Sequence, residues 1–340
     1  MIVKRQDLMD AVKSLTFKSH LIGDWVDKLR FEVTPGNLRL TITDTSIWLV
    51  RNLSVVSAET WSVVTPLSVL RKTLQHIKDD NIDIYAEDNL LVLKDQRDDY
   101  LSVPTIVLPK FPEASDRELI DSRELDKSFI EGVRFLIGLQ DSDITDSRWY
   151  FISALADGWL IGGSPGCTGV VRISEGFGFN LRSETAKIIS RIGSTIKVLL
   201  KDRQLVFQDE HDFNIYAIAE RSQYPYVPAD VTVEGEPWSV DRLSFYTAVQ
   251  TLKGLSGNQS IHGRFSGATL QLTVPTFKAQ KTVQVTGNTP DYGWAVNSGS
   301  LLNVLKRFKG DRVECLQSKK RIRLADQSNQ VAVLTRYAIR

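Results

Sequence analysis

Hydrophobic and polar positions follow one spacing in three distant parts of the chain. Each stretch has apolar residues at its first, third and tenth positions and an aspartate at its fourteenth: Ile82 to Asp95, Ile196 to Asp209 and Val313 to Asp326. Two period-two runs around a short polar gap predict a β-hairpin. The stretches start 114 (196 − 82) and 117 (313 − 196) residues apart. This spacing predicts three copies of one unit.

Two helical stripes accompany each predicted hairpin. Apolar residues spaced three and four apart leave one apolar face on a helix. The stripes that open the copies are Leu8, Val12 and Leu15; Phe129, Val133 and Leu136; and Phe245, Val249 and Leu252. The stripes before the hairpins are Leu67, Leu70, Leu74 and Ile77; Thr185, Ile188, Ile189 and Ile192; and Leu301, Leu305 and Phe308.

Strand patterns fill the space between the two helices of a copy. The runs 38–42 and 270–274 alternate apolar and polar residues, which suits a sheet with one buried face. The pattern therefore predicts an α+β fold in which each copy packs two helices on antiparallel sheets. Proline-containing segments at 104–115 and 224–237 mark the expected boundaries, giving domains 1–115, 116–233 and 234–340.

Composition limits the class of protein. A chain of 340 residues with 42% hydrophobic content can bury two or three cores. Without a long apolar run or a signal-peptide pattern, we expect a cytoplasmic protein that does not enter membranes. Only Cys167 and Cys315 are present, which argues against a disulfide framework.

Metal and cofactor chemistry finds no support in the residue spacing. The four histidines, His20, His76, His211 and His262, lack the spacing of metal ligands, so no metal and no cofactor are expected. The glycine-rich run from Gly162 to Gly166 is not followed by Gly-Lys-Ser or Gly-Lys-Thr, so we interpret it as a turn.

Charge is balanced overall but not along the predicted helices. The chain has 42 Lys and Arg against 41 Asp and Glu. The faces opposite the apolar stripes are nonetheless mostly basic, which suits sequence-independent contact with phosphates if they line one surface. The candidate residues are Lys13, Lys72, Lys127, Arg134, Lys187, Arg191, Lys306 and Arg307. Ordinary solvent exposure of charged helix faces is the alternative interpretation.

Five short motifs occur in the order and spacing of a known family. They are Thr43-Asp44, Phe111-Pro112, Arg148-Trp149-Tyr150-Phe151, Tyr224-Pro225 and the final ten residues, 331–340. With the threefold repeat, they make the whole chain resemble the bacterial DNA polymerase III beta sliding clamp.

The resemblance implies three DNA-clamp domains in an arc that closes into a ring as a head-to-tail homodimer. Such a ring encircles double-stranded DNA without regard to sequence and acts as a processivity factor rather than an enzyme. DNA polymerase and the clamp loader dock on it through clamp-binding peptides. Trp149 and Tyr150 lie where the family's aromatic residues approach DNA, although core packing would explain them equally well.

The resemblance also implies a peptide pocket between the second and third domains. Its walls, carried over by position, are Phe151, Gly166, Cys167, Thr168, Pro225, Val227, Leu334, Arg336, Tyr337, Ala338 and Ile339. The loop 165–169 and the tail 337–340 depart from the family's usual Asp-Gly-His-Arg-Leu and Met-Pro-Met-Arg. Ordinary sheet and loop packing is the alternative role for these positions.

Two other functions remain open. An enzyme on a repeated scaffold, such as a nucleic-acid hydrolase, would need clustered acid, base or metal-binding residues, and no such spacing is recognisable. A clamp-like interaction protein would keep the fold without forming a closed ring. Hydrodynamic mass separates it from the clamp, because a dimeric ring requires a particle of twice 38.3 kDa.

Overall fold

A computed structural model describes the chain except residues 17–24, 26, 98, 109, 115–116, 141–150, 194, 221–231, 258, 329 and 336–340. The described residues form two compact units. Unit 1 comprises Met1–Leu125 and Ile192–Ala219, and unit 2 comprises Asp126–Arg191 and Glu220–Arg340. The chain therefore enters unit 2, returns to unit 1 and enters unit 2 again.

The same order of elements occurs three times along the described chain: strand, helix, four strands, helix, three strands. The first series is β1 (Ile2–Lys4), α1 (Arg5–Ser14), β2 (Lys28–Thr34), β3 (Asn37–Thr43), β4 (Ile47–Ser54), β5 (Trp61–Pro66), α2 (Leu67–His76), β6 (Asn81–Glu87), β7 (Leu90–Lys94) and β8 (Tyr100–Pro104). The second is β9 (Leu119–Leu125), α3 (Lys127–Ile137), β10 (Phe151–Ala154), β11 (Trp159–Ser164), β12 (Cys167–Arg172), β13 (Phe179–Arg182), α4 (Ser183–Ile189), β14 (Ile196–Lys201), β15 (Gln204–Gln208) and β16 (Phe213–Ile218). The third is β17 (Pro237–Asp241), α5 (Arg242–Ser256), β18 (Ser260–Ser266), β19 (Thr269–Val274), β20 (Ala279–Gly287), β21 (Trp294–Asn297), α6 (Ser298–Arg307), β22 (Arg312–Gln317), β23 (Arg321–Ala325) and β24 (Gln330–Thr335), with a 3-10 turn at Pro275–Phe277.

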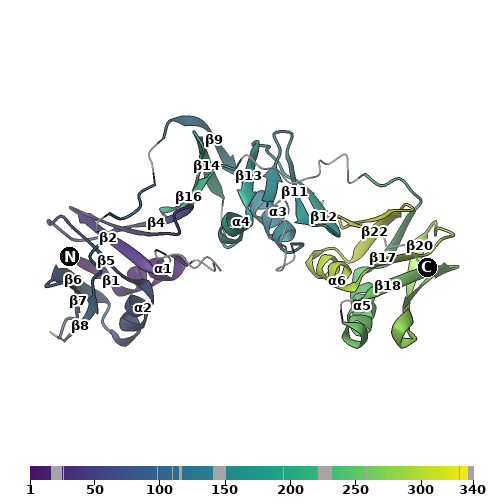
Figure 1. Cartoon of the computed structure of the whole chain (residues 1–340), viewed down its shortest axis with the longest axis horizontal. Coiled ribbons are helices and arrows are strands. Elements are labelled where there is room, and N and C mark those ends of the chain that lie inside the picture. The colour runs from purple at the N-terminus through teal and green to yellow at the C-terminus, as the bar shows by residue number, and fades with distance from the viewer. Residues whose placement is uncertain are drawn as a thin grey trace. The chain divides into compact units, whose positions relative to one another are not determined.

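Unit 1 packs two helices between two antiparallel sheets. The larger sheet has the order β5-β2-β3-β4-β16-β15-β14-β9, and the smaller one has the order β1-β6-β7-β8. Helices α1 and α2 contact each other and strands of both sheets (Figure 1). Leu8, Leu70 and Leu74 from the predicted stripes are fully buried there. The stripes thus form the core that joins the two sheets.

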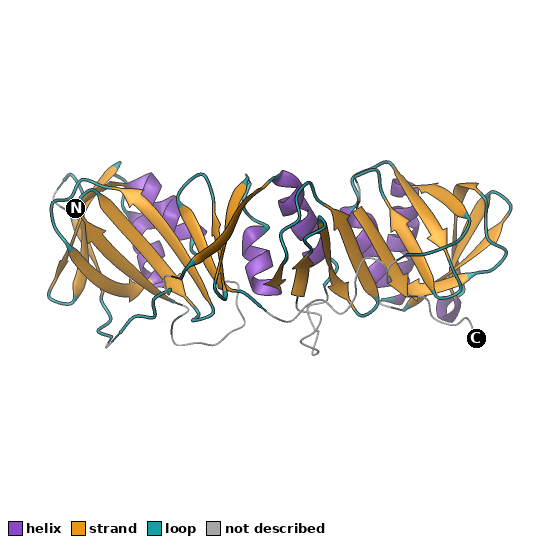
Figure 2. Ribbon diagram, turned by 90° about the horizontal axis from the view of Figure 1, so that it is seen from above, coloured by secondary structure: helices purple, strands orange, loops and turns teal. Residues whose placement is uncertain are grey.

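Unit 2 contains one twelve-stranded sheet of order β13-β10-β11-β12-β24-β23-β22-β17-β20-β19-β18-β21. Helices α3, α4, α5 and α6 lie together on one face of this sheet, as Figures 1 and 2 both show. We call this the helix face and the opposite side the outer face. Phe129, Phe245 and Leu305 from the predicted stripes lie on these helices and are buried.

Short polar side chains fix where several helices begin. Asp126 accepts hydrogen bonds from the backbone N–H groups of Ser128 and Phe129 at the start of α3. Asp241 accepts from the N–H of Ser244 at the start of α5, and Asn297 caps α6 through Ser300 in the same way. These caps satisfy N–H groups that no residue within the helix can pair.

Two details differ from the sequence interpretation. Each series opens with a short strand, β1, β9 or β17, where we expected a helix. The glycine-rich run is also not a turn throughout, because Gly162 and Gly163 belong to β11 and only Pro165 and Gly166 form the turn. Glycine is required at position 163, where φ is +138° and an added Cβ would lie 2.1 Å from the carbonyl oxygen of Cys167.

Candidate nucleic-acid interface and partner pocket

The helices concentrate the positive charge of the chain. Across the six helices of the described chain there are eleven Lys or Arg residues and four Asp or Glu residues. The whole chain has a balance of 42 to 41, so the strands and loops carry the acidic excess. A chain that is neutral overall therefore presents cations selectively on its helices.

Four of the predicted lysines are available for an external anion. Lys72 on α2, Lys127 on α3, Lys187 on α4 and Lys306 on α6 are exposed. Within the described residues, none of the four makes an ion pair. Lys13 on α1 is also exposed, but it lies 3.5 Å from Asp10 in a surface pair that water screens strongly.

Several arginines on the helices instead bind the carbonyl ends of neighbouring helices. Arg71 on α2 donates to the backbone oxygens of Val12 and Leu15, both at 2.9 Å, at the end of α1. Arg242 on α5 donates to the oxygen of Gly310 at 2.8 Å, just after α6. Cations at these sites satisfy unpaired carbonyls and oppose the negative end of the helix dipole.

Burial of the guanidinium group lowers the pKa of Arg71, against an opposing effect from the nearby Asp27. The predicted DNA residue Arg134 also serves a helix end, because its Nε donates to the backbone oxygen of Ser190 after α4. Arg134 and Arg191 are exposed.

Arg307 occupies a specific place between α6 and α3. Its guanidinium lies where a side chain at Gly138 would start, 1.7 Å from the position of an added Cβ. Gly138 ends α3, so the cation again meets a helix C-terminus. Burial lowers the pKa of Arg307. Phe308 stacks on Phe135 beside it, with ring centroids 5.9 Å apart. Arg307 therefore has a structural role at the end of α3, and its contact with DNA stays a prediction.

Part of the predicted peptide pocket lies on adjacent strands of unit 2. Cys167 faces Leu334 and Thr168 faces Val333 where β12 pairs with β24. Alternation along the strands places Thr168, Val333 and Phe151 on the outer face and turns Cys167 and Leu334 toward the helices. Gly166 accepts a hydrogen bond from the N–H of Thr335 at 3.1 Å, next to the turn.

A cluster of apolar side chains lies on the same outer face. Ile161, Val170, Val233 and Val333 pack together and are nearly completely buried. Val233 lies within the proline-containing segment 224–237 and packs on the outer face of the sheet. This cluster was not predicted from the sequence, although consecutive apolar residues at Leu160-Ile161 in β11 and Val170-Val171 in β12 are typical of strands buried on both faces.

Several predicted site residues lie outside the described residues. They are Trp149, Tyr150, Pro225, Val227, Arg336, Tyr337, Ala338 and Ile339. Among the residues that the structure does describe, no group of three or more His, Cys, Asp or Glu side chains is arranged to hold a metal ion. No helix in the described ranges is long and apolar enough to cross a membrane.

Solved structures with the same fold cover the whole chain. The DNA polymerase III subunit beta of Pseudomonas aeruginosa superimposes with a TM-score of 0.88 at 15% identity, covering 100% of both chains. The Borrelia burgdorferi subunit beta, in complex with a natural product, gives 0.88 at 14% identity, covering 100% of this chain and 99% of the other. The Thermotoga maritima subunit beta gives 0.86 at 17% identity, with the same coverage. The chain has the sliding-clamp fold.

Comparison of the sequence alone finds no related family or protein. No protein-family model matches the chain, and a search of curated proteins gave no significant match. The sliding-clamp fold is thus preserved while few residues are shared. The threefold order of elements and the buried stripes survive because they depend on polarity and spacing rather than on particular side chains.

Proposed function

We propose that the protein is a DNA sliding clamp, a homodimeric ring that encircles duplex DNA and tethers a DNA polymerase as a processivity factor. The observation that carries the proposal is the excess of cations on the helices in a chain with no net excess. Weak contacts to phosphates allow movement along DNA, and a closed ring prevents dissociation. The proposed domains are 1–115, 116–233 and 234–340, and the proposed location is the cytoplasm.

Unpaired sheet edges support the homodimer. Strand β4 of the first series pairs with β16 of the second, and β12 of the second pairs with β24 of the third. Strand β20 holds the same place in its series as β4 and β12, and β8 holds the same place as β16 and β24. These two strands are the ones left without such a junction in the described chain. In the described residues β8 pairs only with β7, and the segment 279–284 of β20 pairs only with β19. A second copy would satisfy both edges, and each would otherwise be open to aggregation.

The two observed junctions give the register of the proposed one. Ile215 faces Leu49 in the first junction. Leu101 is equivalent to Ile215, because Leu101 faces Leu93 and Ile215 faces the equivalent Phe207. Ala279 is likewise equivalent to Leu49, because Ala279 faces Val274 and Leu49 faces the equivalent Ile42. Leu101 of one copy should therefore face Ala279 of the other. The same register places Asp99 opposite Lys281.

The chemistry of these edges fits such a junction. Asp99 and Lys281 have opposite charges and make no ion pair within the described parts of the chain. Large apolar side chains are exposed at both edges: Tyr100 is 70% exposed, Leu101 is 39% exposed, and Phe277, in the 3-10 turn just before β20, is 51% exposed. Burial of these side chains would add apolar contact to the strand pairing.

A pair of cysteines tests the register. The double variant Leu101→Cys, Ala279→Cys should form disulfides between copies under mild oxidation, giving a covalent species of twice 38.3 kDa. Paired residues on adjacent antiparallel strands lie within reach of a disulfide. The native Cys167 and Cys315 are buried and should not interfere. Moving one cysteine to Lys281, two residues out of register, is the matched control. A monomer of 38.3 kDa that never cross-links would support the clamp-like protein without a ring.

The proposed binding site for partner proteins lies on the outer face of unit 2. We propose that polymerase and clamp-loader peptides dock where Phe151 and Thr168 meet the apolar cluster, next to the predicted Pro225, Val227 and tail residues. Val227→Asp or Ile339→Asp should abolish binding of a polymerase-derived clamp-binding peptide while the dimer persists in sedimentation. Binding at wild-type strength would contradict the pocket.

A further inference from the structure

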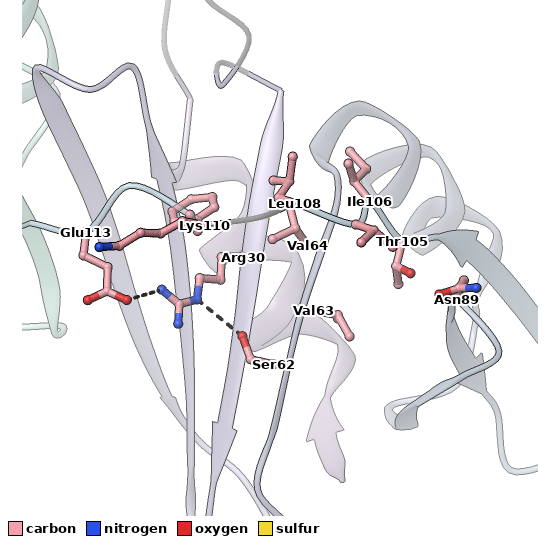
Figure 3. A pocket seen from close by; sticks show the side chains of 12 residues that line it. Arg30, Ser62, Val63, Val64, Asn89, Thr105, Ile106, Leu108, Lys110 and Glu113 are labelled. Atoms are coloured by element: carbon pink, nitrogen blue, oxygen red, sulfur yellow. Dashed lines mark hydrogen bonds and ion pairs between the residues drawn. The ribbon is translucent and has the colours of Figure 1, made fainter.

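A groove lies in unit 1, whereas the proposed peptide pocket belongs to unit 2. Its volume is about 470 Å³, and it runs between β5 and residues 105–108 and 110–113, which follow β8. Figure 3 shows Arg30 between Glu113 and Ser62 at one end of the groove and Asn89 near the other. All of its lining residues belong to unit 1.

One wall of the groove is a strand edge. β5 is the last strand of the eight-stranded sheet, and among the described strands it pairs with β2 alone. The N–H of Leu67 donates to the backbone oxygen of Asp27 across this pair. Backbone groups alternate in direction along a strand, so those of Trp61, Val63 and Thr65 also point toward β2. Ser62 and Val64 therefore point theirs into the groove.

The segment after β8 pairs with this edge at one point only. The N–H of Ile106 donates to the carbonyl oxygen of Val64 at 2.7 Å. The segment then leaves the strand. Among the described residues, neither the N–H of Val64 nor the N–H and carbonyl of Ser62 has a backbone partner. Three hydrogen-bonding groups thus line the groove over two residues of extended strand.

The other wall is mainly apolar. Ile106, Val107, Leu108 and Phe111 line it, and the side chain of Val107 is 83% exposed. Together these side chains give the groove an apolar wall of four residues, to which apolar side chains of a ligand could pack.

The charged groups of the groove differ in their availability. The guanidinium of Arg30 already contacts Glu32 at 2.8 Å, Glu113 at 3.0 Å and Ser62 at 3.3 Å. Lys110 is exposed and makes no ion pair in the described part of the chain. It is therefore the lining cation that can accept a carboxylate from outside.

We propose that this groove binds an extended peptide segment of a partner protein, which adds a strand to the edge of β5. A peptide backbone offers N–H and C=O groups at the two-residue repeat of a strand, so it can pair with Ser62 and Val64. Apolar side chains two positions apart would enter between Val107 and Leu108, and a carboxylate would lie beside Lys110. The site is separate from the proposed pocket of unit 2 and does not depend on ring closure.

The test uses displayed linear heptapeptides selected on the wild-type chain after removal of those that bind Ser62→Pro. Proline removes the edge N–H without breaking a bond to β2 and is tolerated in an edge strand. Ser62→Ala, which keeps that N–H, is the matched control. Selected peptides should alternate apolar and polar residues, include an acidic residue, and bind Ser62→Pro at least tenfold more weakly but Ser62→Ala within twofold.

Two further measurements guard against misfolding of the proline variant. Val107→Asp changes only a surface side chain and should also weaken binding at least tenfold, whereas the bound peptide should slow hydrogen exchange at the N–H groups of Ser62 and Val64. Recovery of no binding peptide, or equal binding to Val107→Asp and wild type, would overturn the proposal.

Discussion

Reversal of three helix lysines tests whether the helices meet DNA. The variant Lys72→Glu, Lys187→Glu, Lys306→Glu changes one exposed residue on each of three helices, none of which makes an ion pair in the described chain. We use Lys306 rather than Arg307 because Arg307 also packs against the end of α3. The change should leave folding intact, since exposed side chains contribute little to stability.

The size of the effect follows from the charges. The helices carry eleven cations and four anions, a net charge of +7, and three reversals lower it by six to +1. Each phosphate contact contributes about 0.9 to the slope of log K against log salt, so three lost contacts lower the slope by about 2.7 per protomer. Between 50 and 200 mM salt, wild-type affinity should therefore fall roughly 40-fold more than that of the variant for each protomer that contacts the duplex.

The assay is fluorescence anisotropy with a short duplex over this salt range. A control variant reverses Lys197, Lys319 and Lys320, which are exposed on strand β14 and the turn between β22 and β23. Its net charge changes by the same six units. We expect the control to keep most of the wild-type salt slope. Equal loss in both variants would show that net charge alone drives binding and would refute the helix interface.

Two further predictions concern the fold and its pH dependence. Gly163→Ala should lower the free energy of unfolding in urea by about 2 kcal/mol or more, because alanine is strained at positive φ and its Cβ would meet the oxygen of Cys167. Gly166→Ala is the control and should be nearly neutral, because an added Cβ there has nothing within 4 Å. Equal losses of stability in the two variants would contradict this explanation. Hydrogen bonds from the side chain and backbone of Ser244 hold the pKa of Asp241 below its usual value. A lowered folded pKa gives stability that is present above the unfolded pKa and is lost as pH falls through the folded one. The stability difference between wild type and Asp241→Asn should therefore shrink as pH falls below about 4, and a constant difference across that range would be the contrary result.

Most of the fold follows from local pattern. The apolar stripes predicted the six helices of the described chain to within a few residues, since Leu70 and Leu74 lie on the buried side of α2 whatever packs there. The repeat itself located the hairpins. The opening strands escaped prediction because β1 has three residues and β9 has largely exposed side chains without alternation.

The candidate site was less predictable because its contacts join residues far apart in sequence. Helical periodicity gives the face on which Arg307 lies but not the neighbouring helix, so its contact with Gly138 was hidden. Arg71 binds carbonyls of α1 that are 56 and 59 positions away. The open edge of β5 likewise depends on where the segment after Ile106 leaves the strand.

The most direct test of the account is topological. Protomers carrying Leu101→Cys and Ala279→Cys would be mixed with circular plasmid, oxidised, and separated from unbound protein in high salt, where phosphate contacts are screened. We predict that covalent dimers remain with circular DNA and are released when a restriction enzyme linearises it. Loss of the cross-linked protein from circular DNA in high salt, or equal retention on circular and linear DNA, would contradict encirclement.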